Sequence, residues 1–383
     1  MAMNFKTIDQ SLSGKTVLIR CDFNVPLEEG QITETARIDA NLKTIRQLIS
    51  LNCKVVLISH LGSPKGFDEK LSLRPVWEYL KSELKQDVRF AQNYYPNLTR
   101  ESLSAITLLE NLRFYKEEEE NNEDFAKFLA GLCDCYVNDA FSVCHRKHAS
   151  IVGVPKFVAE KFAGLTLAQE VNALQKVLAK PEKPLTFLVG GFKASTKIPI
   201  MKNLLGRADN ILVGGAMVAS FWAAQGVKLG KTYFEERLLD DCREILENQE
   251  TKVYLAQDFI CAGTSTGSSK TVSLSDFPED CEVFDIGPKT RQIFGEILGS
   301  SRTVCWNGPL GMFEEDRFAE GTKEVISSLT TTKAFKVAGG GETVTFLNKY
   351  DLFSVFDYVS LAGGAFLEFL EGKSLPGLKA LES

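Results

Sequence analysis

The stretch "FKVAGGGETVTF" (residues 335–346) sets three glycines between an apolar run and an acidic residue followed by β-branched residues. An apolar run of this length that ends in turn residues is typical of a buried strand. The same order recurs in "LTFLVGG" (185–191), "NILVGG" (210–215), "TVCWNG" (303–308) and "DYVSLAGG" (357–364). This repetition predicts strands of a parallel sheet that end in turns without side chains.

Short apolar runs alternate with stretches of helical period in the first half as well. The clearest are "TVLIR" (16–20), "KVVLIS" (54–59), "ITLLE" (106–110) and "DCYVN" (134–138). Alternation of this kind is typical of α/β proteins, and 383 residues fit two domains. We therefore predict two Rossmann-like, three-layer αβα domains with parallel sheets and a hinge cleft between them.

A long helix is predicted to join the domains over residues 164–181. Its apolar residues recur at helical spacing (Leu167, Val171, Leu174 and Leu178), Thr166 and Gln169 fit a capping box, and Pro181 ends it. An ordinary surface helix has the same periodicity. The predicted domains cover residues 1–163 and 182–360.

Composition narrows the class of function. A net charge of −6 argues against general affinity for nucleic acid or membrane, so anion binding requires local clusters of cations. The nine cysteines are odd in number and form no CxxC pair, which favours reduced thiols in a cytoplasm. The two cysteines of "CDC" (133–135) are expected to lie in the core beside a strand. The N-terminus lacks the features of a signal peptide, and no apolar run is long enough to span a bilayer.

Polar residues follow several strands of the first half, where ligands bind in open parallel sheets. They include two histidines and four arginines (Arg20, Asp22, Asn24, Arg37, His60, Arg113, His145 and Arg146), and His148 lies nearby. Arginine pairs bidentately with phosphate and carboxylate, so we expect a small, multiply charged anion. Each residue alone is as consistent with a solvated or ion-paired strand end, and a metal site at the histidines is disfavoured. "KEEEENNED" (116–124) is predicted to be a solvated helix start.

The glycine-ended strands of the second half predict a phosphate site built from backbone amides. Lys193 and Lys197, at i and i+4, can point at the same phosphate chain, and Glu342 can hold Mg²⁺. One glycine pair alone would indicate only a tight turn. P-loop, GxGxxG and protein-kinase motifs are absent. Two anion sites on two closing domains favour direct in-line phosphoryl transfer.

Several motifs, in this order, resemble the phosphoglycerate kinase family over nearly the whole chain. They are "RCDFNVP", "HLGSPKG", "LENLRF", "NDAF…HRKHAS", "GGFKASTKI", "WNGPLGMFE", "GGGET" and "LEGKSLPG". The resemblance implies reversible phosphoryl transfer from 1,3-bisphosphoglycerate to ADP, giving 3-phosphoglycerate and MgATP in glycolysis. It also implies a C-terminal segment, residues 361–383, that returns to the first domain.

The resemblance assigns site residues. Catalytic roles fall to Arg37, Lys193, Gly340 and Gly363. The glycerate would be bound by Arg20, Asp22, Asn24, Arg37, His60, Arg113, His145 and Arg146. The nucleotide would be bound by Gly191, Phe192, Lys193, Lys197, Gly214, Gly215, Asn307, Pro309, Glu314, Gly339, Gly340, Gly341, Glu342 and Thr343, with Glu342 at the metal.

The chain departs from the family pattern at several of these positions. Ser63 replaces an arginine, for which Lys65 can compensate, and Glu342 replaces an aspartate. Phe192 replaces a small residue, and further changes fall at Val143, Thr196, Ala216, Leu361, Ala362 and Phe366. We expect an active, monomeric enzyme. A nucleotide-binding paralogue with weak catalysis and a scaffold role is the alternative, and a two-domain dehydrogenase is disfavoured.

Overall fold

The computed structural model describes residues 5–382, which fall into two compact units. Unit 1 comprises residues 5–172 and 374–382, and unit 2 comprises residues 173–373. The division falls inside helix α5 (Leu165–Leu178), between Asn172 and Ala173. Helix α12 (Gly364–Leu370) lies between the sequence boundary expected at residue 361 and the unit boundary at Ser374.

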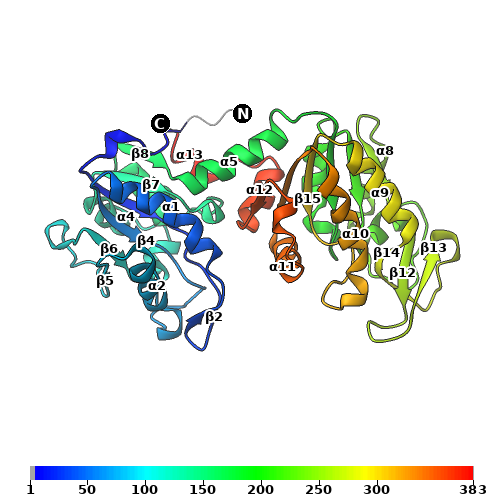
Figure 1. Cartoon of the computed structure of the whole chain (residues 1–383), viewed down its shortest axis with the longest axis horizontal. Helices are drawn as coiled ribbons and strands as arrows, with labels where there is room; N and C mark the ends of the chain where they lie inside the picture. Colours follow the sequence, from blue (N-terminus) through cyan, green and yellow to red (C-terminus); the bar gives the residue numbers. More distant parts are fainter. Residues whose placement is uncertain (1–4, 383) are drawn as a thin grey trace. The chain divides into compact units, whose positions relative to one another are not determined.

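A six-stranded parallel sheet in the order β5-β6-β4-β1-β7-β8 forms the centre of unit 1 (Figure 1). Its strands are β1 (Thr16–Arg20), β4 (Lys54–Ile58), β5 (Arg89–Ala91), β6 (Ile106–Leu109), β7 (Cys135–Asn138) and β8 (Glu160–Ala163). The helices are α1 (Ala36–Ser50), α2 (Arg74–Leu84), α3 (Lys116–Glu119), α4 (Glu123–Gly131) and α13 (Pro376–Lys379), and β2 (Leu27–Glu28) pairs with β3 (Gln31–Ile32). All residues of β1, β6 and β7 are buried, including the predicted core cysteine Cys135.

A second parallel sheet, in the order β11-β10-β9-β15-β16-β17, forms the centre of unit 2. Its strands are β9 (Leu185–Val189), β10 (Asn210–Val213), β11 (Lys252–Leu255), β15 (Thr303–Asn307), β16 (Phe335–Gly339) and β17 (Tyr358–Ser360). Besides α12, the helices are α6 (Ile198–Leu204), α7 (Val218–Ala224), α8 (Leu239–Glu247), α9 (Pro288–Ser300), α10 (Glu320–Ser328) and α11 (Gly341–Lys349). The predicted α/β class with two parallel sheets is confirmed.

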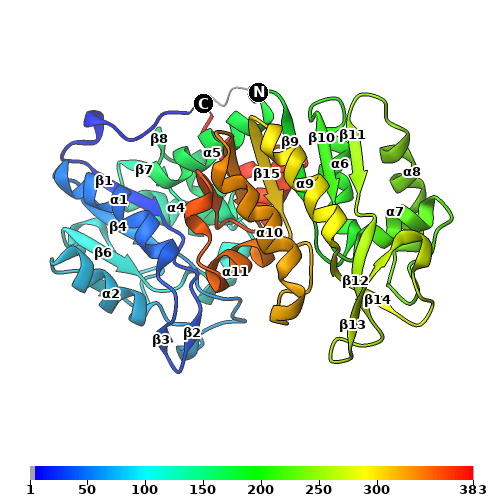
Figure 2. The same ribbon diagram turned by 45° about the vertical axis from the view of Figure 1, so that its right-hand side comes forward.

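Unit 2 also carries an antiparallel sheet that the sequence did not indicate. Strands β12 (Asp258–Ala262), β13 (Ser269–Ser273) and β14 (Glu282–Ile286) pair in the order β13-β12-β14 and lie together in Figure 2. Among the described residues, none of the helices combines the length and apolarity needed to cross a bilayer.

The registers of both sheets bring strand ends together. In unit 1, Arg20 at the end of β1 pairs with Ile58 of β4 and Asn138 of β7. In unit 2, Val189 at the end of β9 pairs with Val213 of β10 and Asn307 of β15. The turns that follow these strands are therefore neighbours, which is the arrangement that a ligand site requires.

The predicted capping box at the start of α5 is wrong. Helix α5 begins at Leu165, so Thr166 lies inside it, and Gln169 is exposed. The amides of Thr166 and Leu167 instead donate to Oδ1 of Asp139, at 2.8 and 3.1 Å. Asp139 follows β7, so the first turn of α5 is fixed to the sheet of unit 1.

Candidate functional site

The loops after β1 and β4 form one face of the candidate anion site in unit 1. Asn24 Oδ1 accepts a hydrogen bond from the amide of Gly62 at 2.8 Å, which ties the two loops together. Asp22 Oδ1 accepts from the amide of Asn24 at 3.2 Å. The side chain of Asp22 lies in turn 3.5 Å from a guanidinium nitrogen of Arg37. Asp22 and Asn24 thus orient the loops and one arginine.

Three arginines border this face. Arg37, in the first turn of α1, also donates to the carbonyl oxygen of Asn24 at 3.1 Å. Arg113, in a short 3-10 helix (Leu112–Phe114), donates to the carbonyl oxygen of Gly62 at 2.7 Å. Arg146 is exposed. Ser63, which stands where the family pattern has arginine, lies 3.3 Å from Arg113, so it lengthens this hydrogen-bond network without adding charge.

Arg20 and His60 lie beneath the three arginines. Arg20 is fully buried and donates to Ser150 Oγ at 3.0 Å and to the carbonyl oxygen of Cys21, and its third nitrogen lies 3.0 Å from His60 Nδ1. The predicted place of Arg20 at the rim therefore needs correction, because its guanidinium is already used inside the protein. Burial, followed by the charges of Arg20 and Arg113, holds the pKa of His60 well below its usual value. His60 is therefore neutral.

Glu118 is a residue of this site that the sequence did not reveal. It belongs to "KEEEENNED", which was expected to be solvated, yet its side chain is fully buried. Its two oxygens accept hydrogen bonds from the hydroxyl and the amide of Ser150, at 2.6 and 2.9 Å. Since Ser150 also contacts Arg20, the carboxylate is the counter-charge of the buried guanidinium, although burial itself raises the pKa of Glu118.

His145 and His148 follow β7 without forming a metal centre. No cluster of three or more metal-binding side chains occurs among residues 5–382. His148 Nδ1 lies 3.9 Å from Glu118 Oε1, and burial together with neighbouring arginines lowers the pKa of His148 to about 4. His145 is half-buried and is the last of the neighbouring groups that lower the pKa of His148.

Two adjoining pockets in unit 2 lie at the turns after β9, β10 and β15. The polar pocket, of about 420 Å³, is lined by Gly191, Phe192, Lys193, Thr196, Lys197, Asn307, Gly308, Gly340, Gly341, Glu342, Thr343 and Leu367. The apolar pocket, of about 380 Å³, shares Gly191, Phe192 and Glu342 with it. A ligand with a polyanionic end and an apolar end can therefore lie continuously across both.

The two predicted lysines line the polar pocket and differ in exposure. Lys193 is exposed, whereas Lys197 is 7 % exposed at the start of α6. Burial lowers the pKa of Lys197, and the nearby carboxylate of Glu342 acts in the opposite direction. Because a buried ammonium group has lost its hydration shell, its attraction to an anionic ligand is stronger than it would be in water.

The three glycines of "AGGGE" have different neighbours. A methyl group on Gly339 would lie 2.8 Å from the ring of Phe366. The space beside this glycine is therefore filled by a side chain of unit 2. Gly340 has a φ of 102°, and a methyl group there would collide with the side-chain amide of Asn307. Gly341 has nothing within 4 Å of the corresponding position and begins α11 at the pocket. Only Gly341 leaves its whole side-chain space to a ligand.

Other predicted glycines also pack against the chain itself. A methyl group on Gly214 would lie 2.7 Å from Leu310, and one on Gly215 would lie 2.6 Å from the amide nitrogen of Gly191. Gly215 and Gly191 still line the apolar pocket, but Gly214 lines neither pocket. Gly363 lines neither pocket either and directly precedes the short helix α12, with a φ of 56°. The sequence alone did not show which glycines pack against the chain and which border a pocket.

Several side chains with oxygen atoms line the polar pocket, among them those of Glu342, Asn307 and Thr343. The carboxylate of Glu342 is exposed in the first turn of α11. Asn307 donates to the carbonyl oxygen of Gly339 at 2.6 Å, and its buried Oδ1 accepts no hydrogen bond from any described residue. Thr343, by contrast, is buried, and its hydroxyl accepts from the amide of Gly308 at 2.8 Å. One carboxylate beside a phosphate site fits the way in which proteins hold Mg²⁺ with a nucleotide.

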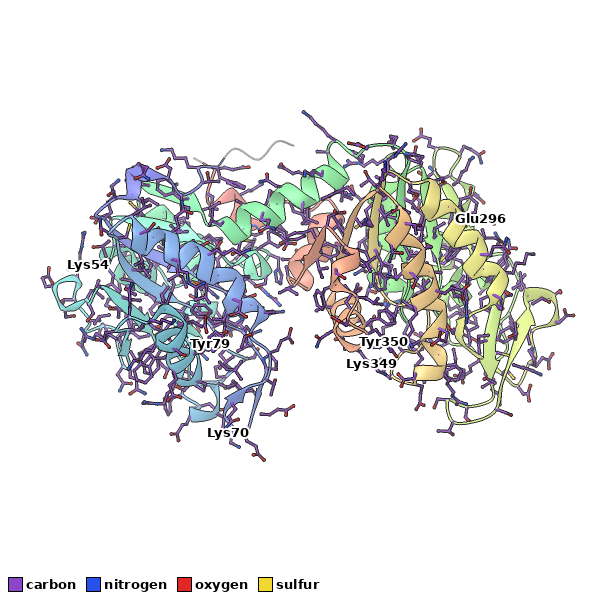
Figure 3. The ribbon with its side chains drawn as sticks, in the orientation of Figure 1. Lys54, Lys70, Tyr79, Glu296, Lys349 and Tyr350 are labelled. Atoms are coloured by element: carbon purple, nitrogen blue, oxygen red, sulfur yellow. The ribbon has the colours of Figure 1, made fainter. Side chains whose placement is uncertain are left out.

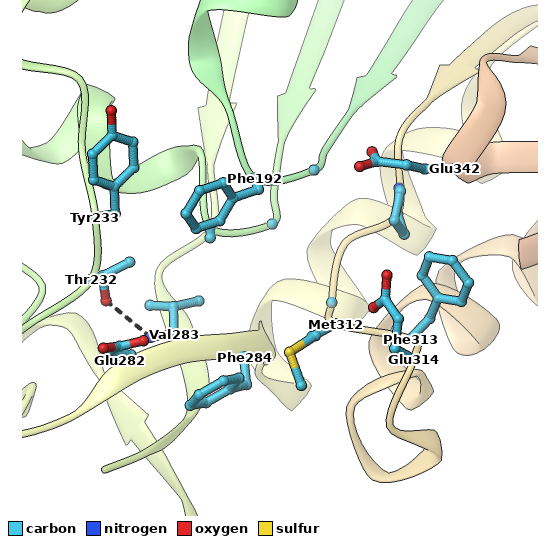
Figure 4. Close-up of a pocket in the computed structure, with 15 residues that line it drawn as sticks. Phe192, Thr232, Tyr233, Glu282, Val283, Phe284, Met312, Phe313, Glu314 and Glu342 are labelled. Carbon is cyan, nitrogen blue, oxygen red and sulfur yellow. Dashed lines mark hydrogen bonds between the residues drawn. The ribbon is translucent and has the colours of Figure 1, made fainter. Parts of the chain in front are cut away.

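The apolar pocket lies between β14 and the loop after β15 (Figure 4). Its lining residues include Pro309, Glu314 and the apolar side chains of Val283, Phe284, Met312 and Phe313. Phe192 and Tyr233 stack on each other at 5.4 Å between ring centroids, with the ring planes 16° apart. Tyr233 was not predicted, because no glycine or charged motif marks it.

Lys349 and Tyr350 lie at the C-terminal end of α11 (Figure 3). They hold the loop that carries Phe313 and Glu314. Lys349 donates to the carbonyl oxygen of Phe313 at 2.8 Å and pairs with Asp316 at 2.8 Å. The hydroxyl of Tyr350 lies 2.7 Å from Asp316. Helix α11 therefore contacts the polar pocket with its first turn and the wall of the apolar pocket with its last.

Comparisons with known proteins agree on one family. The family model described as "Phosphoglycerate kinase" matches residues 7–373. Phosphoglycerate kinase of Finegoldia magna is 43 % identical, with 99 % of this chain and 100 % of that protein covered. The enzyme of Aquifex aeolicus is 40 % identical over 98 % of this chain and 97 % of its own. The structure of phosphoglycerate kinase from Coxiella burnetii has a TM-score of 0.93 at 37 % identity, with 99 % of both chains covered.

Proposed function

The chain belongs to the phosphoglycerate kinase family, and its activity is that of a phosphotransferase between 1,3-bisphosphoglycerate and ADP. From this premise we propose how its residues divide the reaction. The observation that carries the proposal is the pair of adjoining pockets in unit 2, one with two lysines and the first turn of a helix, the other largely apolar. This is the shape and polarity of a nucleoside diphosphate.

In unit 2, the phosphates of ADP or ATP lie in the polar pocket. Lys197 and the backbone amides at the start of α11 bind them, because a helix N-terminus favours anions. Exposed Lys193 meets the charge on the transferred phosphoryl group. Glu342 and Asn307 Oδ1 would hold the Mg²⁺ of the nucleotide, and the bound metal would neutralise charge at the phosphates. Glu314 binds the ribose.

In unit 1, Arg37, Arg113 and Arg146 bind the phosphate and carboxylate of the glycerate. Neutral His60 offers a hydrogen bond from its other ring nitrogen, since Nδ1 faces Arg20. Arg20, Ser150 and Glu118 act from beneath as positioning residues. The reaction needs no protein nucleophile, so orientation and charge stabilisation account for catalysis. We also propose a cytoplasmic location. All nine cysteines are free thiols, which supports this part of the proposal.

A coupled assay tests the proposal. The purified chain, given 1,3-bisphosphoglycerate, ADP and Mg²⁺, is expected to form ATP, and the reverse reaction is expected to consume it. ATP formation that depends on both substrates and on Mg²⁺ supports the proposal. Normal ADP binding without turnover would refute it and favour a nucleotide-binding paralogue.

A further inference from the structure

We propose that Phe192 and Tyr233 form a stacking surface for the nucleobase in this chain. The inference rests on the proposed function and deepens it by naming how Phe192 would contact the base and by adding Tyr233 to the site. Phe192 is 53 % exposed and Tyr233 is 51 % exposed. They are two of the four large apolar side chains that the described part of the chain exposes, and they touch each other.

Exposed aromatic side chains that gather at a pocket indicate a ligand more strongly than single ones do. Phe192 and Tyr233 lie on one side of the apolar pocket, and Phe313 and Glu314 lie on the other (Figure 4). The space between them suits a flat group. A base that stacks on an aromatic ring gains affinity independently of its hydrogen-bonding edge.

Charge separates the two pockets. The apolar pocket is lined by three carboxylates, those of Glu282, Glu314 and Glu342, and by no lysine or arginine among the described residues. A phosphate group would be repelled there, whereas both lysines line the polar pocket. The part of the ligand beside Phe192 and Tyr233 is therefore its uncharged end, the base.

Phe192 also fixes where the base ends. It is one of only three residues that line both pockets, together with Gly191 and Glu342. It follows Gly191, whose φ of 105° and packing against Gly215 and Pro309 fix the backbone. An aromatic ring on this rigid turn is held at the boundary between base and phosphates. Stacking there adds to affinity at a small entropic cost.

The test compares two probes, ADP and inorganic tripolyphosphate, on the whole chain by calorimetry. Phe192→Ala is expected to raise the Kd of ADP about tenfold and Tyr233→Leu severalfold. Both should leave the Kd of tripolyphosphate within about twofold, because that probe has no base. Phe192→Trp is expected to retain ADP affinity. Phe157→Ala, which removes an exposed ring from unit 1, is the matched control and should change neither Kd.

Three outcomes would overturn the inference. Unchanged ADP affinity in Phe192→Ala would show that the ring does not contact the base. Tighter binding would show that the ring blocks the pocket. Equal weakening of both probes, with the melting temperature preserved, would place the effect at the phosphates. A wild-type chain that binds no ADP would instead overturn the proposed function, so the two failures are distinguishable.

Discussion

A double-mutant cycle can test the contact between Phe366 and Gly339 of the stretch "FKVAGGGETVTF". Gly339 ends β16, and Phe366 is fully buried in α12. A methyl group on Gly339 would lie 2.8 to 2.9 Å from three atoms of the Phe366 ring. Ordinary carbon–carbon contacts are about 3.5 to 4.0 Å. The methyl group and the ring therefore compete for one space.

Each single substitution should destabilise the fold for a different reason. Phe366→Ala removes a buried ring and leaves a cavity, which lowers the free energy of unfolding by about 3 to 5 kcal/mol. Gly339→Ala places the methyl group against the ring. The backbone tolerates alanine there, since the φ of Gly339 is not positive. The cost is therefore overpacking alone, about 1 to 3 kcal/mol.

In the double variant the methyl group enters the space that the ring has left. The overpacking cost disappears and part of the cavity is filled. The double variant should therefore be more stable than the sum of the single effects by about 1 to 3 kcal/mol.

Urea unfolding followed by tryptophan fluorescence measures these free energies. Trp306 in β15 reports on unit 2, and Trp77 in α2 reports on unit 1. Trp77→Phe in the background leaves a signal from unit 2 alone, because the two remaining tryptophans, Trp222 and Trp306, both lie in unit 2. Additive effects, within about 0.5 kcal/mol, would refute the reasoning. So would a large rise in the KM for ADP in the double variant, because Gly339 lines neither pocket of the nucleotide site.

Three further predictions follow from the same contacts. Gly341→Ala should raise the KM for ADP about tenfold and leave the melting temperature unchanged, because its methyl group would enter the polar pocket and meet no protein atom; kinetics and thermal melting check it, and an unchanged KM would contradict it. Lys193→Ala should lower kcat about 10²- to 10³-fold, measured at saturating substrates, with little change in stability because the side chain is exposed; retention of kcat would assign the charge stabilisation to other groups. The pKa of His148 is lowered to about 4 in the folded chain, so the unfolded chain binds the extra proton and stability should fall as the pH drops from about 6.5 towards 4; His148→Gln should flatten this slope in urea unfolding, and an unchanged slope would exclude His148 as its source.

Much of the fold could be predicted because strands buried on both faces leave a strong apolar signal. Strands β1, β4, β9 and β15 each begin where their apolar run begins. The short edge strands β5 and β8 carry no such signal, since β8 reads Glu160-Lys161-Phe162-Ala163 and half of it is partly exposed. The antiparallel strand β13 is mostly exposed and polar, so its pairing depends on tertiary contacts that sequence periodicity does not report.

The candidate site was predictable where arginines or lysines gather at strand ends and helix starts, because such clusters bind anions. Arg37, Lys193 and Lys197 belong to such clusters. Glu118 could not be singled out, because four consecutive glutamates look alike until α3 turns one of them inward. Gly339 and Gly341 likewise differ only through Phe366, which is distant in the sequence and adjacent in the fold.

Helix α11 sets a distance as well as a contact. Its nine residues, at about 1.5 Å each, span about 13 Å between the turn that begins at Gly341 and the lysine that holds the Phe313 carbonyl oxygen. The spacing between the two ends of the nucleotide site is thus set by the rise of the helix backbone and not by the choice of side chains. A single-residue insertion in α11 would rotate Lys349 by about 100° about the helix axis. It would also lengthen the distance between Gly341 and Lys349 by about 1.5 Å. Such an insertion would detach the loop from its anchor, however well the helix itself still folded.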